Sequence, residues 1–178
     1  MGLAKAEPRQ GIYLSRPKGI LSQIALWWRH HGCGISMSTA KEVFADRYPG
    51  AAIFARLRAE GAVLCAVSPK RLMLEMTGTI PTEYLIDVLA ESRAAGHLAT
   101  DDFFALVDMT DFTGVLDWQV IPKISEVMPK GDSVNKNAYI VRNTMFAVLA
   151  KINMVLFPKT QHRTFATAAE ARAWLGWE

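Results

Sequence analysis

The distribution of apolar and polar positions becomes regular from about residue 61 onward. Short apolar runs alternate with longer segments in which apolar residues recur every three or four positions. The short runs predict strands and the longer segments predict helices, because a buried strand is apolar throughout and a surface helix is apolar on one face. The expected strands are residues 62–67, 72–78, 103–108, 138–142 and 162–167. The expected helices are residues 81–96, 118–127, 144–157 and 168–177.

The order of these elements predicts the fold class. The first two strands are joined by the turn "SPKR" and form a hairpin, after which strands and helices alternate to the end of the chain. Alternation of this kind is typical of a parallel sheet with right-handed crossovers. We therefore expect an α/β fold: a mostly parallel sheet of about five strands with an antiparallel edge and four helices, over residues 61–178.

Residues 37–60 are interpreted as a helical lead-in to this domain. The segment 38–48 has the composition of a helix, with Ser38 as its N-cap, and Pro49 and Gly50 end it. Residues 51–59 fit a helix and a loop equally well.

Charge separates the first 36 residues from the rest. They carry a net charge of +4, whereas residues 37–178 carry −1, so the basic character belongs to the start of the chain. Their glycines and prolines predict a mobile basic arm or an extension upstream of a true start at Met37. The alternative is that a stripe including Ile20, Ile24 and Trp28 docks on the domain or on an anionic membrane surface. The remainder offers no basic excess, so no nucleic-acid partner is predicted.

Few residues indicate catalysis. The two cysteines, Cys33 and Cys65, have no CxxC spacing, which favours free thiols and a cytoplasmic location. The sequence contains no run of 18 apolar residues, no phosphate-binding glycine motif and no G-x-S-x-G elbow. No catalytic residue, cofactor or metal ion is therefore predicted, although an enzyme assembled from scattered residues stays open. The histidines His97 and His162 are interpreted as surface residues.

Two short motifs carry a resemblance to a known family. "VDMTDFTG" follows the expected central strand, and "TFATAAEARAWL" lies near the end of the chain. With the element order from residue 61, these resemble the STAS domain, the sulfate-transporter and anti-sigma-factor-antagonist fold. The closer likeness is to its SpoIIAA-like branch, in which a strand ending in Asp, a short loop with Gly and a final helix recur. That branch is similar in architecture to CRAL-TRIO lipid-transfer domains.

The resemblance implies a non-catalytic regulatory module. Anti-sigma-factor antagonists bind a protein partner and are switched by phosphorylation of a Ser or Thr after the central strand. By this likeness Thr113, directly before Gly114, is the possible phosphoacceptor, although the chain departs here from the family's longer Asp-Ser-Ser-Gly loop. The expected partner or ligand loop comprises Asp108, Thr110, Asp111, Thr113, Gly114, Asp117 and Trp118.

Three alternatives remain for the same segments. The aspartates fit turn and cap positions, with Asp108 at the end of a strand. A weaker alternative is a magnesium-dependent hydrolase that uses the cluster from Asp108 to Asp117. A third is a carrier of a small apolar ligand or lipid, since the helix at 144–157 is apolar beyond one face. Its expected ligand face is Met145, Phe146, Leu149, Met154 and Phe157. The oligomeric state stays open.

Overall fold

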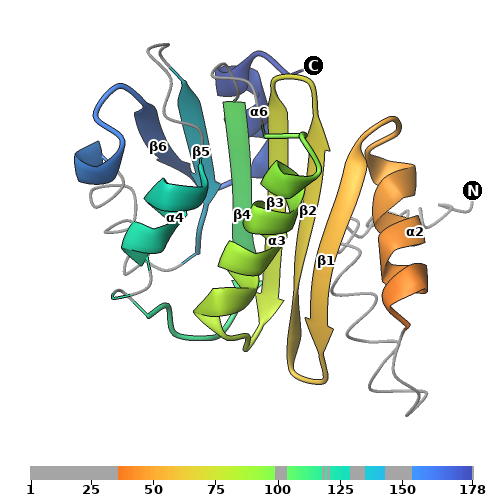
Figure 1. Cartoon of the computed structure of the whole chain (residues 1–178). Coiled ribbons are helices and arrows are strands. Elements are labelled where there is room, and N and C mark those ends of the chain that lie inside the picture. Colours follow the sequence, from red (N-terminus) through yellow and green to blue (C-terminus); the bar gives the residue numbers. More distant parts are fainter. Residues whose placement is uncertain are drawn as a thin grey trace, which may run out of the picture. The chain divides into compact units, whose positions relative to one another are not determined.

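The described part of the fold is built on one sheet, whose strands lie side by side in the order in which they occur along the chain (Figure 1). The structure is a computed structural model, and it describes residues 36–98, 104–117, 119, 121–128, 135–142 and 154–177. The strands are β1 (Ala52–Arg58), β2 (Gly61–Ser68), β3 (Arg71–Gly78), β4 (Phe104–Phe112), β5 (Lys136–Ile140) and β6 (Gln161–Phe165). The helices are α2 (Met37–Arg47), α3 (Thr82–Ala94), α4 (Ile121–Val127) and α6 (Ala168–Leu175).

The sheet is mixed in the way that the sequence predicts. The pairs β1–β2 and β2–β3 are antiparallel, whereas β3–β4, β4–β5 and β5–β6 are parallel. The predicted α/β class with an antiparallel edge is therefore confirmed. The number of described strands is six rather than about five.

The additional strand is β1, which lies in residues 51–59, the segment whose sequence fits a helix and a loop equally well. β1 pairs with β2 along its whole length, from Ala52 opposite Val67 to Arg58 opposite Gly61. The backbone hydrogen bonds of this ladder decide the conformation, because the segment lacks a strict alternation of apolar and polar residues. Partner pairing thus overrides a weak local preference.

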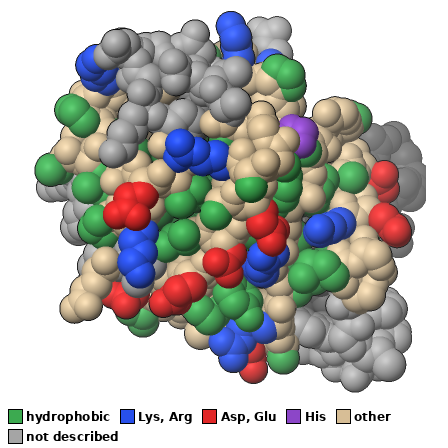
Figure 2. All heavy atoms as spheres, viewed as in Figure 1, with side chains coloured by type: hydrophobic (Ala, Val, Ile, Leu, Met, Phe, Trp, Pro, Cys, Tyr) green, Lys and Arg blue, Asp and Glu red, His purple; other side chains and the backbone are tan. Residues whose placement is uncertain are grey.

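The helices lie on both faces of the sheet, and the strand order accounts for one of these layers. Strands β3 to β6 advance in one direction across the sheet, so right-handed crossovers place their connecting helices on the same face. Figure 1 shows α3 and α4 on one face of the sheet and α6 on the other. Acidic and basic side chains are interspersed over the face that carries α3 and α4 (Figure 2).

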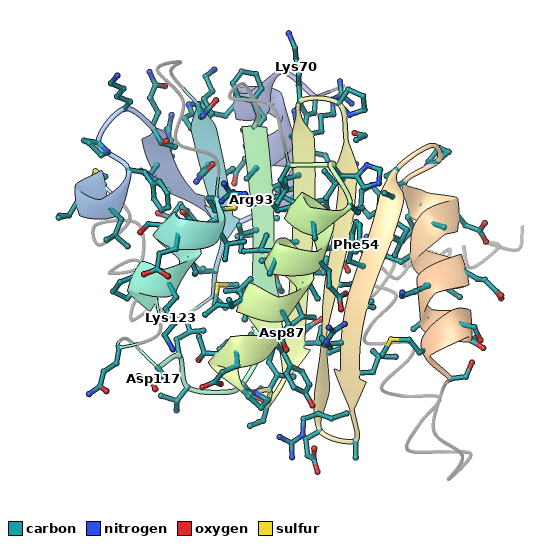
Figure 3. The ribbon with its side chains drawn as sticks, viewed as in Figure 1. Phe54, Lys70, Asp87, Arg93, Asp117 and Lys123 are labelled. Carbon is teal, nitrogen blue, oxygen red and sulfur yellow. The ribbon has the colours of Figure 1, made fainter. Side chains whose placement is uncertain are left out.

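The main core lies between the sheet and α3. Alternate residues of β2 and β3 point towards it, and Val88 and Leu89 of α3 meet them. Arg93 ties α3 to the short helix α4, because its Nη1 donates to the carbonyl oxygens of Glu126 and Val127, each at 2.7 Å (Figure 3). These carbonyls end α4, where a cation is favoured by the helix dipole.

The final helix begins where the sequence predicts, whereas the first described helix does not. The final helix has a reciprocal capping box between Thr167 and Glu170 and ends at Gly176 in the left-handed conformation. The first described helix begins one residue earlier than expected. Its N-cap is Ser36, whose Oγ accepts from the backbone N–H of Thr39 at 3.1 Å, so the prediction of Ser38 is wrong.

Several predictions fall on other parts of the chain. The arm at 1–35, most of the helix expected at 144–157, and Trp118 lie outside the described residues. Of that expected helix, residues 154–157 are described, of which 154–156 are helical. None of the described helices has the length and hydropathy needed to cross a membrane.

Cys65 is expected to be unreactive in the folded protein. Its side chain is fully buried in β2, and burial raises the pKa of its thiol to about 12, so the nucleophilic thiolate is suppressed. In a Cys33→Ser background, a thiol reagent at pH 8 should label no cysteine under native conditions and one after addition of denaturant. Rapid native labelling would contradict the burial of this strand.

Candidate functional site

The central strand β4 extends beyond the point that the sequence predicted. Asp108 pairs with Glu75 of β3, whereas Asp111 pairs with Thr77, so β4 contains one more residue than β3 between these pairs. This irregularity is a β-bulge. The expectation that Asp108 ends the strand is wrong, because the ladder continues to Phe112.

The bulge changes which way the following side chains point. The Oδ1 of Asp108 accepts from the backbone N–H of Thr110 at 2.9 Å, which satisfies a donor at the irregularity. Met109 and Phe112, three residues apart, are both part of the apolar core. In a regular strand, residues three apart face opposite sides. The aspartate therefore has a structural role in the bulge.

Backbone hydrogen bonds anchor the loop that follows β4. The carbonyl oxygen of Gly78 accepts from the N–H groups of Thr113 and Gly114, at 3.0 and 3.2 Å. At the other end of the loop, the N–H of Asp117 donates to the Oγ1 of Thr82 at 2.8 Å. The loop is thus fixed to the end of β3 and to the start of α3.

The anchored loop exposes every second side chain. Gly114 and Leu116 are buried, whereas Thr113, Val115 and Asp117 are exposed. Val115 is 77% exposed, so the loop presents an apolar side chain to the surface. We define this surface, residues 113–117, as the display loop.

The predicted site residues are only partly brought together. Asp111 lies 3.9 Å from Arg142 on β5's carboxyl side, and Asp117 accepts the N–H of Gln119 through Oδ1 at 2.9 Å. Asp111 and Asp117 therefore interact with different neighbours, Arg142 and the backbone of Gln119 respectively. Among the described residues, no group of three acidic, histidine or cysteine side chains is placed to hold a metal ion. The magnesium alternative thus finds no support in the described part of the chain.

Thr113 is accessible, as a phosphoacceptor must be. Its Oγ1 lies 3.3 Å from the Oγ1 of Thr79 in the turn after β3. Gly114 has no room for a side chain, because a Cβ would lie 2.9 Å from the ring of Phe112. Phosphorylation of Thr113 remains a prediction.

A buried ion pair lies on the opposite face of the sheet and was missed by the sequence reasoning. Glu75 of β3 is 6% exposed, and its Oε1 lies 2.7 Å from the Nη1 of Arg47. The hydroxyl of Tyr48 donates to the same carboxylate at 3.2 Å. Burial raises the pKa of Glu75, Arg47 opposes the rise and Asp108 adds to it. The signal was a glutamate at a strand position flanked by Leu74 and Met76.

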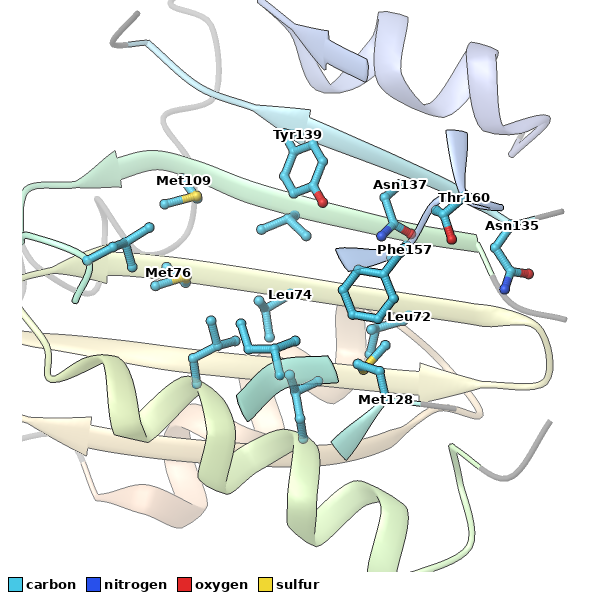
Figure 4. A pocket seen from close by; sticks show the side chains of 16 residues that line it. Leu72, Leu74, Met76, Met109, Met128, Asn135, Asn137, Tyr139, Phe157 and Thr160 are labelled. Carbon is cyan, nitrogen blue, oxygen red and sulfur yellow. The ribbon is translucent and has the colours of Figure 1, made fainter. Parts of the chain in front are cut away.

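A cavity of about 90 Å³ lies on the face of the sheet that carries α3 and α4. Its apolar wall comes from β3, β4, α3, the region of α4, the display loop and Phe157, which lies shortly before β6 (Figure 4). These residues are Leu72, Leu74, Met76, Leu85, Leu89, Ala105, Val107, Met109, Leu116, Ile124, Met128 and Phe157. None of the described lining residues carries a charge.

The cavity has one polar end. Asn135, Asn137 and Thr160 lie close together beside Phe157, and Tyr139 lies further along β5 (Figure 4). The Tyr139 hydroxyl is 3.1 Å from the Nδ1 of His162.

His162 is not the surface residue that the sequence indicated. It is half-buried, and desolvation lowers the pKa of its imidazole, with a smaller opposing effect from the backbone of Phe157. Its ring stacks on Tyr139 across the β5–β6 pair. By contrast, His97 is exposed, as expected.

Two residues of the predicted apolar-ligand face, Met154 and Phe157, lie in the described part of the chain. Phe157 lines the cavity, whereas Met154 is 47% exposed and does not. Met145, Phe146 and Leu149 lie outside the described residues. The described part of the cavity wall comes mainly from the sheet and α3, because alternate residues of three neighbouring strands converge there.

Comparison with known proteins adds a likeness of fold. No family model and no curated protein matches the chain. Among solved structures, the chain is similar to an uncharacterized protein of the DUF3478 family with a SpoIIAA-like fold, from Shewanella loihica PV-4. The two are 16% identical with a TM-score of 0.43, over 71% of this chain and 94% of that chain. The α/β class itself is established by the strand order and register of this chain.

Proposed function

We propose that the protein is a non-catalytic, STAS-like binding module that engages a protein partner through the display loop. The observation that carries this proposal is the fixed loop with Val115 exposed at its centre. Thr113 and Asp117 flank it as exposed polar groups. An apolar contact with a polar surround is the usual arrangement of a protein interface.

The rigidity of the loop supports recognition. Binding costs less free energy when the contacting segment is already ordered, because little conformational entropy is then lost. Gly78 and Thr82 supply that order by accepting three hydrogen bonds from backbone N–H groups of the loop, two at the Gly78 carbonyl oxygen and one at the Thr82 Oγ1. The loop also follows the carboxyl end of a central parallel strand, the edge at which ligands of open α/β sheets bind.

Phosphorylation would regulate this contact. A phosphate on Thr113 would place nearly two negative charges two residues from Val115, and these would have to be desolvated when the partner binds. The proposal places the module in the cytoplasm, which is consistent with the free, buried thiol of Cys65. A lipid carrier is less favoured, since the cavity volume of about 90 Å³ is well below the roughly 300 Å³ at the lower limit of pockets that enclose drug-sized ligands, and a lipid is at least that large.

Val115→Asp is expected to reduce partner capture by about tenfold or more, since a charge would be buried in the contact. The matched control is Val155→Asp, because Val155 is 80% exposed but lies outside the display loop. Tagged wild type and both variants would be incubated with extract of the native cells, and captured proteins would be quantified by mass spectrometry. Both substitutions should leave the free energy of unfolding within about 0.5 kcal/mol of wild type.

The informative result is a difference between the two variants. A protein captured equally by wild type and Val155→Asp, but lost with Val115→Asp, would support the proposal. Equal recovery with all three proteins would contradict the placement of the interface on the display loop.

A further inference from the structure

The cavity described above has a polar end that its own residues do not satisfy. The Oδ1 of Asn137 is inaccessible to solvent and has no hydrogen-bond partner among the described residues. Buried polar atoms in folded proteins nearly always have a partner, in the protein or in a bound molecule. Asn137 also lines the cavity, so a molecule inside the cavity is a candidate for that partner.

The chemistry of the wall restricts what such a molecule can be. The described lining carries no charge, so none of these residues would compensate the burial of a charged ligand. Most of the wall is aliphatic or thioether, which favours an apolar body. The unpartnered Oδ1 of Asn137 is an acceptor, and it would therefore pair with the donor of a hydroxyl or an amide group.

The volume restricts the size. The cavity of about 90 Å³ is smaller than the roughly 150 Å³ cavity that holds benzene in an engineered protein. A body of about four carbon atoms is therefore the largest that the present cavity takes. A long acyl chain does not fit without a wider opening.

We infer that the cavity between the sheet and helices α3 and α4 is a binding site for a small, uncharged molecule with a short apolar body and one hydroxyl or amide group, held by Asn137. The polar end of this site is distant from the exposed side chains of the proposed partner surface, although the buried Leu116 of the display loop lines another part of the cavity. Asn137 pairs with Ala105 near the amino end of β4, whereas the display loop follows its carboxyl end, roughly 25 Å away at the rise of a strand.

Some methionines of the chain line the cavity and others lie away from it, so together they provide probes and controls for binding. Met76, Met109 and Met128 line the cavity. Met73 is buried but is not among the lining residues, and Met37 is 39% exposed on α2. Methyl resonances of 13C-labelled methionine would therefore report binding in the cavity, and Met73 and Met37 would serve as internal controls.

The probe is butan-1-ol, compared with 1-chlorobutane, which has nearly the same shape but no hydroxyl group, and with butyrate, which is charged. We expect butan-1-ol to shift the three cavity methyl resonances saturably and to leave those of Met73 and Met37 unchanged. 1-Chlorobutane should bind about tenfold more weakly, the effect of one lost hydrogen bond to a buried group. Butyrate should produce no saturable shift.

Asn137→Leu tests the polar contact itself, since leucine keeps the size and removes the amide. In this variant the ratio of the affinity for butan-1-ol to that for 1-chlorobutane should fall from about ten to about one. Val115→Asp should bind butan-1-ol as wild type does, so failure of the partner proposal and failure of this inference are distinguishable. If Asn137→Leu does not fold, the comparison of the three probes on wild type still decides the question.

Three results would overturn the inference. The first is equal binding of butan-1-ol and 1-chlorobutane to wild type. The second is a shift of all methionine resonances alike, which would indicate a general solvent effect. The third is no saturable shift with any probe, which would mean that Asn137 is satisfied by an ordered water only.

Discussion

Replacement of Gly78 by alanine is expected to lower the free energy of unfolding by roughly 3 to 5 kcal/mol, from left-handed strain and a steric clash together. Gly78 ends β3 with a φ of +60°, a conformation that side chains disfavour. A Cβ at this position would also lie 1.9 Å from the carbonyl oxygen of Glu60. The backbone must therefore move, and the carbonyl that anchors Thr113 and Gly114 moves with it. Partner capture through the display loop should fall as well.

Gly96→Ala is the matched control for this prediction. Gly96 has a φ of +81°, but no heavy atom lies within 4 Å of a Cβ built there. The substitution therefore adds conformational strain without the clash, and it should cost about 1 kcal/mol. Urea denaturation of both variants measures the difference. Equal costs would show that the approach of Glu60 to Gly78 does not constrain the turn.

Arg47→Met is expected to lower the free energy of unfolding at pH 7 by roughly 2 to 4 kcal/mol, because it leaves the carboxylate of Glu75 buried without its cation. The expected loss in the free energy of unfolding is smaller than for the breaking of a fully buried pair, since the Arg47 side chain is 30% exposed. Tyr48 would still donate one hydrogen bond to Glu75. The methionine keeps the aliphatic part of the side chain, so lost packing contributes little.

The loss should depend on pH in a defined direction. Burial raises the pKa of Glu75 in the folded protein, whereas the charge of Arg47, followed by the hydrogen bond from Tyr48, lowers it. A raised folded-state pKa means that protonation favours folding, so this contribution is fully present below the unfolded pKa and is lost as pH rises through the folded pKa. Removal of Arg47 raises the folded pKa further. The destabilisation should therefore be smaller at pH 5 than at pH 7.5.

Arg58→Met is the control, because Arg58 pairs with Glu60 while both side chains are exposed. That pair is screened by solvent, so its loss should have a much smaller effect than Arg47→Met at both pH values. Urea denaturation of wild type and both variants at pH 5 and pH 7.5 measures these differences. A pH-independent loss for Arg47→Met would contradict the assignment to the Glu75 carboxylate.

The sequence alone determined the elements whose signals are local. The final helix has its capping box in Thr167 and Glu170, three residues apart, and these residues satisfy each other whatever surrounds them. The apolar runs of β2 and β3 and the turn between them predicted a hairpin correctly. The order of strands and helices then indicated the α/β class, since few topologies accommodate such an order.

The tertiary structure decided what depends on partners distant in the chain. β1 is a strand because β2 pairs with it, and Asp108 lies within β4 because β3 continues beside it to Gly78. The candidate sites likewise depend on residues that are distant in the chain. The display loop is held by Gly78, 35 residues before Thr113 along the chain, and the cavity gathers Asn137 with residues of α3 and α4.

The physical reason is the range of the interactions involved. Caps, turns and helical periodicity arise between residues a few positions apart, so a single sequence displays them directly. Burial, strand register and cavity volume arise only when segments far apart in the chain pack together. Glu75 shows the difference: its place in an apolar strand was visible in the sequence, but its pairing with Arg47, 28 residues earlier, required the packing of α2 against the sheet.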